Sequence, residues 1–426
     1  MEVYMSAPAQ PAATVTNANA AALERLFACE PRLIAVAPAG DVIPGMRKDL
    51  VLTSGPTLPF SAYSGGQRDG LLGAAMYEGF ASDRDAAAAA FERGTLTVAG
   101  CQTLGVVGSL AGLTTASMPV LVVEDPRTGR RAYCTLYEGD TADRLNYGTY
   151  TEATRENLDH LRDRICPALD RVVRHHGGIP LKPIIGRALT MGDELHSRNT
   201  AATALFARTL LPAITDAASA DARVLADYLA GGDYFFLRLA MAAAKVMADT
   251  MRGVVGSTLV TSMAFSCKEF GIQVAGTGDR WFCGPLPTFE AVRLYPGFTD
   301  DDVEFMGGES VITEVVGLGG VAQAAALPLQ RSSGGNAAIM IGRTVEMYDI
   351  CAGEHPDLRI PALDYRGTPV GFDVRRVAET GITPYLDIGI AGVGGGQIGG
   401  GVARAPIEPF VQAAEALTQL NKERNA

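Results

Sequence analysis

The chain has 426 residues, a length typical of two or three domains, because single domains usually hold about 100 to 200 residues. Hydrophobic residues make up 47% and charged residues 19%, a composition that excludes a disordered or fibrous protein. The 36 Lys and Arg and 47 Asp and Glu give a net charge of −11. Nucleic acids and anionic membrane surfaces are therefore not expected partners.

The cysteines and the N-terminal segment indicate a cytoplasmic protein. Seven cysteines are scattered without a CxxC pair, as is typical of reduced thiols. Residues 1–20 lack the basic start and apolar stretch of a signal peptide. Residues 95–123 carry no charge and are long enough to span a membrane. Their recurring Gly, Thr and Ser, together with Pro119, favour buried strands joined by a glycine-rich loop instead.

The first part of the chain predicts both strands and helices. Residues 33–52 contain two short apolar runs, each closed by glycine, which predict strands. Further on, Asp83 precedes a run of alanines that stops at Gly94, and this order of cap, helix formers and glycine predicts a helix. We therefore expect residues 1–150 to form an N-terminal α/β region.

The middle third predicts helices. Apolar residues recur at helical spacing over residues 158–173, and we expect Pro167 to kink or divide this helix before it ends at residues 175–178. Further helices are predicted at about residues 200–214, 222–230 and 234–252. Residues 151–255 are therefore expected to form a mainly helical domain.

Strand patterns return after Gly256, in the runs STLVTSMAF and FGIQVAG, and a helix is predicted at about residues 407–421. We expect residues 256–426 to form a glycine-rich α+β domain. The whole chain is predicted to be α+β and multidomain, with mixed α/β regions and a small inserted helical domain. Its 49 glycines are more than usual and indicate loops where the backbone approaches a ligand or another strand closely.

The densest polar cluster is MGDELHSRN at residues 191–199. If this segment is helical, Asp193 and His196 share a face, and so do Glu194 and Arg198. A carboxylate beside an imidazole fixes the tautomer of the ring and raises its basicity, as general acid or base chemistry requires. We therefore expect His196, Asp193 and Glu194 to be catalytic. An ion-paired helix start is the alternative that the pattern leaves open.

A second cluster, GTGDRWF at residues 276–282, follows a predicted strand. The planar fork of donors on Arg280 suits a carboxylate or a phosphate, and Gly278 would let backbone N–H groups contribute. A β-turn with an internal pair between Asp279 and Arg280 is equally consistent with the sequence.

Glycine loops occur at residues 64–68, 317–320, 333–336 and 394–401. None has the pattern of a P-loop or of a dinucleotide fingerprint, so we expect no nucleotide cofactor. The last loop, with Gly395, Gly396 and Gln397, could present backbone N–H groups to a small anion, although a tight structural turn is the alternative. No His and Cys pair has zinc spacing, and no metal site is predicted.

The ordered segments MGDELHSRN, GSTLVTSMA, FGIQVAGTGDRWF, IPALDYRGTPVGFDVRRV and GGGQIGGG resemble the family that contains the AllG (YlbE) subunit of bacterial oxamate carbamoyltransferase. The resemblance runs from about Gly40 to Pro409. It implies an α+β fold with a small helical domain. It also implies transfer of a carbamoyl group between carbamoyl phosphate and the amide of oxamate, which gives oxalurate and phosphate. In allantoin degradation, a branch of purine catabolism and nitrogen metabolism, this reaction would run toward carbamoyl phosphate.

The resemblance further implies partner subunits, one of them similar to an acyl-CoA synthetase, and we expect a homo-oligomer as well. The substrates are small anions, and attack on the carbamoyl carbon creates an oxyanion that needs positioned donors. We expect one glycine-walled cavity to hold His196 as the base, oriented by Asp193, with the anion-binding and neutral donors Arg198, Arg280, Asn199 and Gln397.

Four departures from the family pattern favour a different acceptor or a lost reaction. Where we expect Cys, three histidines and Asn, the chain has CQTLG at residues 101–105. Phe265-Ser266 replaces an expected Arg-Asn pair, Tyr234 replaces an expected histidine, and Gly392-Val393 replaces an expected His-Lys pair. Two alternatives therefore stay open, namely a phosphate-independent hydrolase of a cyclic amide or ureide, and a non-catalytic assembly subunit.

Overall fold

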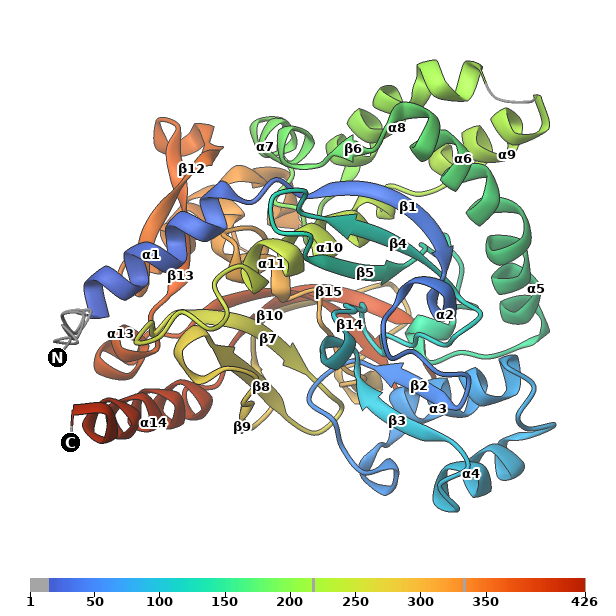
Figure 1. Ribbon diagram of the computed structural model, residues 1–426, viewed down its shortest axis with the longest axis horizontal. Helices are drawn as coiled ribbons and strands as arrows, with labels where there is room; N and C mark the ends of the chain where they lie inside the picture. Colours follow the sequence, from blue (N-terminus) through green and yellow to red (C-terminus); the bar gives the residue numbers. More distant parts are fainter. Residues whose placement is uncertain (1–14, 217–218, 332–334, 426) are drawn as a thin grey trace, which may run out of the picture.

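The computed structural model describes residues 15–216, 219–331 and 335–425 (Figure 1). Most of the N-terminal segment searched for a signal, and Ser333 and Gly334 of the third glycine loop, lie outside the described residues. The described chain contains long helices and several separate sheets, which confirms the predicted α+β class.

One sheet forms the upper layer in Figure 1, with its strands in the order β5-β4-β1-β6. The strands are β1 (Arg32–Pro38), β4 (Pro119–Glu124), β5 (Arg131–Thr135) and β6 (Ile179–Pro180), and each adjacent pair is antiparallel. The apolar run at the end of residues 95–123 is therefore a buried strand, β4, as predicted. No helix in the described ranges is long and apolar enough to cross a membrane.

Helix α10 (Phe235–Asp249) runs through the centre of the molecule. Its sequence FFLRLAMAAAKVMAD is apolar on nearly every side, and a helix of this kind is stable only when surrounded by protein. It packs against β4 and β5 of the upper sheet and against β7 of the sheet β7-β8-β9. These strands are β7 (Val260–Phe265), β8 (Phe270–Val274) and β9 (Phe282–Gly284).

The glycine-rich sheet has the order β10-β15-β14-β11, with β10 (Thr288–Leu294), β11 (Val303–Glu304), β14 (Tyr385–Gly392) and β15 (Gln397–Arg404). Glycine is required here because neighbouring strands approach closely. A Cβ placed on Gly401 would lie 2.3 Å from the carbonyl oxygen of Ala291 on β10. The absence of side chains on this part of β15 also leaves open space beside the sheet, at Gly400 and Gly401.

The remaining elements surround these layers (Figure 1). Strands β2 (Leu50–Thr53) and β3 (Thr97–Gly100) are parallel, and β12 (Cys351–Ile360) pairs with β13 (Arg366–Phe372). The longer helices are α1 (Val15–Ala28), α3 (Gly65–Tyr77), α4 (Arg84–Glu92), α5 (Glu152–His160), α6 (Cys166–His176), α7 (Lys182–Thr190), α8 (Thr200–Thr215), α9 (Ser219–Ala230), α12 (Ala337–Met347), α13 (Val374–Thr380) and α14 (Glu408–Asn425). The short helix α11 spans Ile312–Val315.

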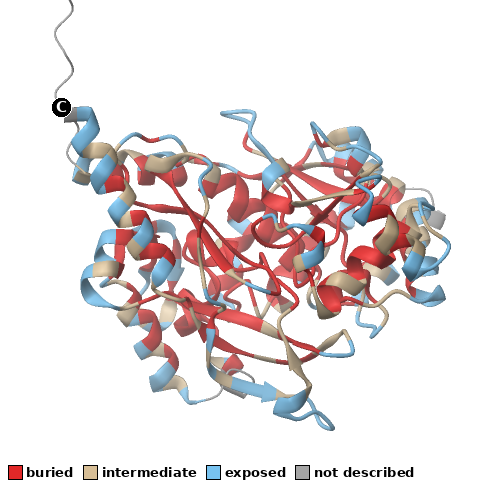
Figure 2. Cartoon of the chain, turned by 90° about the horizontal axis from the view of Figure 1, so that it is seen from below, coloured by how far each residue is buried: buried red, intermediate tan, exposed pale blue. Residues whose placement is uncertain are grey.

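The helices predicted in the middle third and at the C-terminus are confirmed as α5, α6, α8, α9, α10 and α14. The break expected at Pro167 takes the form of a π-helical turn, Leu161–Ile165, between α5 and α6. Proline has no N–H to donate to the carbonyl four residues before it. A π turn does not use that hydrogen bond, so it accommodates Pro167. One cluster of buried apolar side chains has members from α1 to α14. Figure 2 shows buried residues throughout the interior. The three domains predicted with boundaries at residues 150 and 255 stay a prediction.

Candidate active site

His196 lies in the loop between α7 and α8 and faces a cavity of about 250 Å³. The opposite wall is glycine backbone from Gly389 on β14 and from Gly400 and Gly401 on β15. Other walls come from α10, from the end of β10 and from residues 109–110. The cavity therefore joins elements that are distant in the sequence, and the glycine wall predicted from composition is present.

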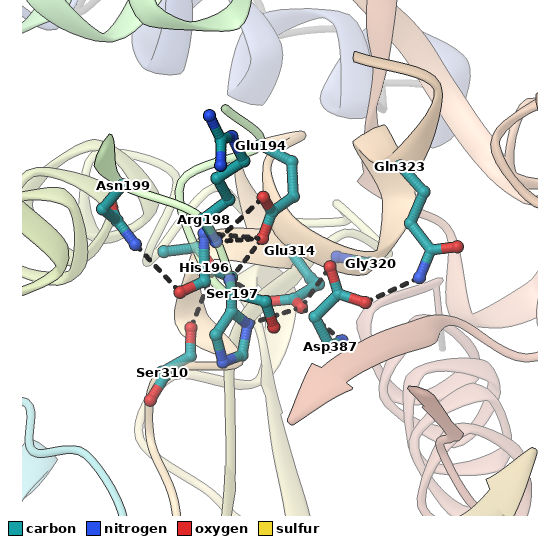
Figure 3. A network of polar contacts seen from close by, with 11 residues as sticks. Glu194, His196, Ser197, Arg198, Asn199, Ser310, Glu314, Gly320, Gln323 and Asp387 are labelled. Atoms are coloured by element: carbon teal, nitrogen blue, oxygen red, sulfur yellow. Dashed lines mark hydrogen bonds and ion pairs between the residues drawn. The ribbon is translucent and has the colours of Figure 1, made fainter. Parts of the chain in front are cut away.

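His196 is held by Glu314 (Figure 3), and both side chains are buried. The His196 Nδ1 atom lies 2.8 Å from Glu314 Oε1. Glu314, on α11, also accepts hydrogen bonds from the backbone N–H groups of Gly320 and Asp387, each at 3.0 Å, and from the Thr313 hydroxyl. These donors fix the carboxylate, which in turn fixes the imidazole ring with its other nitrogen, Nε2, available to a ligand.

The pKa of His196 is raised above its usual value of 6.5. Burial by itself lowers the pKa, but the Glu314 carboxylate and Asp387 together outweigh it because negative charge stabilises the imidazolium. A raised pKa in the folded state means that this pair stabilises the fold fully below pH 6.5, and that the contribution is lost as pH rises through the folded pKa. The folded protein therefore keeps a proton on His196 at a higher pH than a free histidine would.

Residues 191–199 form turns instead of a helix, so Glu194 and Arg198 do not share a helix face. Leu195 has a φ of 71°, which breaks helical geometry at this point. The Glu194 carboxylate instead accepts hydrogen bonds from three successive backbone N–H groups, those of His196, Ser197 and Arg198 (Figure 3). Glu194 thus holds the backbone of the loop that carries His196, which is a positioning role.

Asp387 on β14 is buried beside Glu194. Its Oδ1 accepts a 2.6 Å hydrogen bond from Gln323, but its Oδ2 has no donor among the described residues. Burial raises the pKa of both carboxyls, and their proximity favours one shared proton. A proton shared between the two carboxyls would give Asp387 Oδ2 a partner and relieve the repulsion between them.

The variant Asp387→Asn tests this shared proton. An amide at this position still donates to Glu194 and still accepts from Gln323, so stability at pH 6 should change by less than about 1 kcal/mol. In the wild type the folded carboxyl binds a proton between pH 3.8 and about 6 that the unfolded one releases, so this group's contribution falls as pH rises across that window. Urea unfolding from pH 4 to 7 should show a flatter pH dependence for the variant. An identical slope for both proteins would contradict the shared proton.

Asp193 does not orient His196, in contrast to the prediction. Its Oδ2 accepts a 2.8 Å hydrogen bond from the Ala202 N–H in the first turn of α8, and its Oδ1 lies 3.3 Å from Arg198 Nε. Asn199 donates from Nδ2 to the His196 carbonyl. These three residues brace the loop, and none of them lines the cavity.

The structure does not bring Arg280 into the His196 cavity. Arg280 is exposed in the turn before β9, and its guanidinium lies 4.6 Å from the centre of the Phe282 ring. Asp279 is exposed and pairs with Arg252 instead of with its neighbour. Gly278 has a φ of +67°, so it serves the turn. The expectation that Arg198 and Arg280 converge on His196 is therefore wrong.

Of the predicted anion-binding residues in the last glycine loop, Gln397 lines the cavity, whereas Gly395 and Gly396 do not. The amides expected to bind an anion are already used, because Gly395 N–H donates to the Gly392 carbonyl and Gly396 N–H donates to the Tyr147 carbonyl. Both glycines have positive φ, which favours glycine in the tight turn between β14 and β15. Gly395 and Gly396 therefore form a tight structural turn, which is the alternative that the sequence left open.

Two other arginines supply the positive charge near His196. Arg293, at the end of β10, lines the cavity. Arg238 on α10 is 1% exposed and donates from Nη1 to the hydroxyl of Ser109, which also lines the cavity. Two further nitrogens of Arg238, Nε and Nη2, have no partner among the described residues. The buried cation behind Ser109 makes the cavity favourable for an anion.

One of the four departures from the family pattern lies in the wall of the His196 cavity. Tyr234 lines the His196 cavity. In contrast, Gln102 is buried and donates to the Met263 carbonyl while it accepts from Ser262 on β7. None of residues 101–105, 265–266 and 392–393 lines the His196 cavity.

Sequence reasoning missed Glu314, Asp387 and Arg293. A signal for Glu314 was present, because a single glutamate within the apolar run VITEVVGLG has to be buried against a partner when the run is buried. Within the described ranges, no group of three or more His, Cys, Asp or Glu side chains is arranged to hold a metal ion.

Comparison with known proteins gives the family. Residues 96–310 match the family described as oxamate carbamoyltransferase subunit AllG. The chain is 37% identical over 414 residues to the oxamate carbamoyltransferase subunit AllG of Escherichia coli (strain K12), covering 95% of this chain and 98% of that protein. It is 34% identical to the uncharacterized protein YahG of the same organism, over 94% of this chain and 85% of YahG.

A solved structure has the same fold. The crystal structure of a conserved protein of unknown function from Enterococcus faecalis V583 superposes with a TM-score of 0.92 at 33% identity, covering 95% of this chain and 98% of that one. The family match and the full-length identity together show that this chain belongs to the family of oxamate carbamoyltransferase subunits of the AllG type.

Proposed function

We propose that the chain is a carbamoyltransferase subunit that moves a carbamoyl group between phosphate and the nitrogen of a small amide or ureido acid. The observation that carries the proposal is the buried pair of His196 and Glu314, which opens on a glycine-walled cavity with Arg293 and Ser109 in its wall. The similarity to a protein named oxamate carbamoyltransferase subunit AllG supports the substrate class.

The chemistry is simplest to follow toward carbamoyl phosphate. A phosphate oxygen attacks the carbamoyl carbon, a C–O bond forms, and the C–N bond to the acceptor breaks. The departing amide nitrogen is a poor leaving group and needs a proton, which the imidazolium of His196 supplies from Nε2. In the opposite direction the neutral imidazole takes that proton back. A raised pKa of His196 supports this role because it keeps the general acid protonated.

The arginines near His196 have a separate role, which is to bind anions. Phosphate, carbamoyl phosphate and the acid substrate are all anions, and the developing oxyanion adds charge at the carbamoyl carbon. Arg293 in the cavity wall, and Arg238 acting through the Ser109 hydroxyl, would stabilise this charge. The relative is named as a subunit, which supports a hetero-complex for this chain as well. The resemblance implies that one partner is similar to an acyl-CoA synthetase.

The test is acceptor-dependent release of phosphate from carbamoyl phosphate by the purified chain, alone and together with the candidate partner subunits of its genome. Oxamate and longer amide acids serve as acceptors, and the spontaneous breakdown of carbamoyl phosphate is subtracted. Release that requires an acceptor supports the proposal. No acceptor dependence in either preparation contradicts it, and hydrolysis of a cyclic ureide without phosphate would favour the hydrolase alternative.

A further inference from the structure

A second cavity of about 420 Å³ adjoins the His196 cavity. The two cavities share the side chains of Tyr147, Tyr234, Tyr295 and Gln397 as a common wall. The two cavities are therefore direct neighbours on either side of these residues. The second cavity has room for more than the short skeleton of oxamate, and the reaction in the His196 cavity does not explain why it exists.

Arg144 is the cation of the second cavity. The residue is 9% exposed, and its guanidinium lies 3.6 Å from the centre of the Tyr147 ring. Its Nη1 donates a long 3.4 Å hydrogen bond to the Gly139 carbonyl, whereas its Nε has no partner among the described residues. A buried guanidinium with unused donors is costly unless an anion fills the site. The planar fork fits a carboxylate best.

Asp140 provides the opposite charge in the same cavity and accepts a hydrogen bond from the Tyr137 hydroxyl. Among the described residues, Asp140 forms no ion pair with Arg144, so each charge can meet a ligand group of its own. The aromatic rings of Tyr147, Tyr234, Tyr295 and Phe298 also face this space. The cavity thus offers one site for a carboxylate, one for an N–H donor and flat walls for a planar amide.

From these features we infer that the second cavity binds the acid end of the acceptor, with its carboxylate on Arg144, and that the acceptor is an amide or ureido acid longer than oxamate. The inference rests on the proposed function, because the amide end of this acceptor is placed beside His196. Arg144 and Asp140 are therefore specificity-determining residues, whereas His196 and Arg293 face the reacting group.

Equilibrium binding of matched acids and amides to the full chain tests the inference. Isothermal titration compares succinamate with the neutral succinamide, and oxamate with oxamide. We expect wild-type protein to bind succinamate at least about tenfold more tightly than succinamide, a difference of about 1.4 kcal/mol, and more tightly than oxamate. Arg144→Gln should abolish the preference for the acid. The matched control Arg280→Gln, at an exposed arginine that also lies over an aromatic ring, should keep it.

Equal binding of succinamate and succinamide by the wild type overturns the inference, and this comparison holds even if Arg144→Gln fails to fold. Tighter binding of oxamate than of succinamate overturns the proposed length. Acid binding that depends on Arg144 without any carbamoyl transfer supports the site while contradicting the proposed function. Carbamoyl transfer with an acid preference that Arg144→Gln leaves intact contradicts the inference alone.

Discussion

Replacing His196 with glutamine should lower the rate of carbamoyl transfer by about 10²- to 10⁴-fold, the usual contribution of a positioned general acid or base. Glutamine is close to histidine in size and can still contact Glu314, so the loop should keep its shape. The measurement is acceptor-dependent phosphate release in whichever preparation is active, with substrate binding measured in parallel.

The matched control is His175→Gln, because His175 is an exposed histidine at the end of α6, with 63% of its side chain accessible. Its rate should equal that of the wild type. If His196→Gln keeps full activity in the complex, His196 is not the general acid and the chain acts as an assembly subunit. A loss of activity caused by unfolding is recognised from the thermal transition of the variant.

Replacing Glu194 with alanine should lower the free energy of unfolding by about 3 to 5 kcal/mol. The change removes the acceptor for three successive backbone N–H groups in a loop where Glu194 itself is fully buried. Each backbone N–H group left without an acceptor costs about 1 to 3 kcal/mol. Relaxation of the loop makes the total loss smaller than the sum of the three costs. Urea unfolding at pH 6 gives the value.

Glu194→Gln separates this structural role from a catalytic one, since an amide oxygen can still accept from the loop. It should lose much less stability than Glu194→Ala and keep most of the activity. Glu156→Ala, at an exposed position on α5, serves as the control and should change stability by less than about 0.5 kcal/mol. Equal, small losses for Glu194→Ala and Glu156→Ala would show that Glu194 does not hold the loop.

The parts of the fold that local rules govern could be predicted from the sequence. Helix α4 has its Asp83 cap, helix α10 has its uninterrupted apolar sequence, and β4 follows Pro119, so each element is encoded within its own residues. The segment at residues 191–199, which would place Asp193 and His196 on one face if it were helical, forms turns instead. Its carboxylates find backbone donors and Arg198 at positions that only the tertiary fold supplies, and Leu195 with positive φ interrupts the helical spacing.

The site was only partly predictable, because its pairs join distant segments. His196 was identified from its polar surroundings, but its partner Glu314 is 118 residues away, and Asp387 reaches the same network from β14. Arg280 and Arg293 look alike in a sequence, since both lie near strand ends and aromatic residues. Their difference arises from sheet topology, because β10 pairs with the glycine strand β15 that forms the cavity wall, whereas Arg280 is in an exposed turn.

The proposed function requires that an anionic carbamoyl compound binds beside the imidazole of His196. Histidine ring signals in a nuclear magnetic resonance titration test it directly, since the chain has five histidines and His196→Gln identifies the relevant one. Phosphonoacetamide, a stable isostere of carbamoyl phosphate, should shift the His196 signal and raise its pKa further, while His175 stays unchanged. Saturating ligand that leaves the His196 signal and its pKa unaltered would contradict the account.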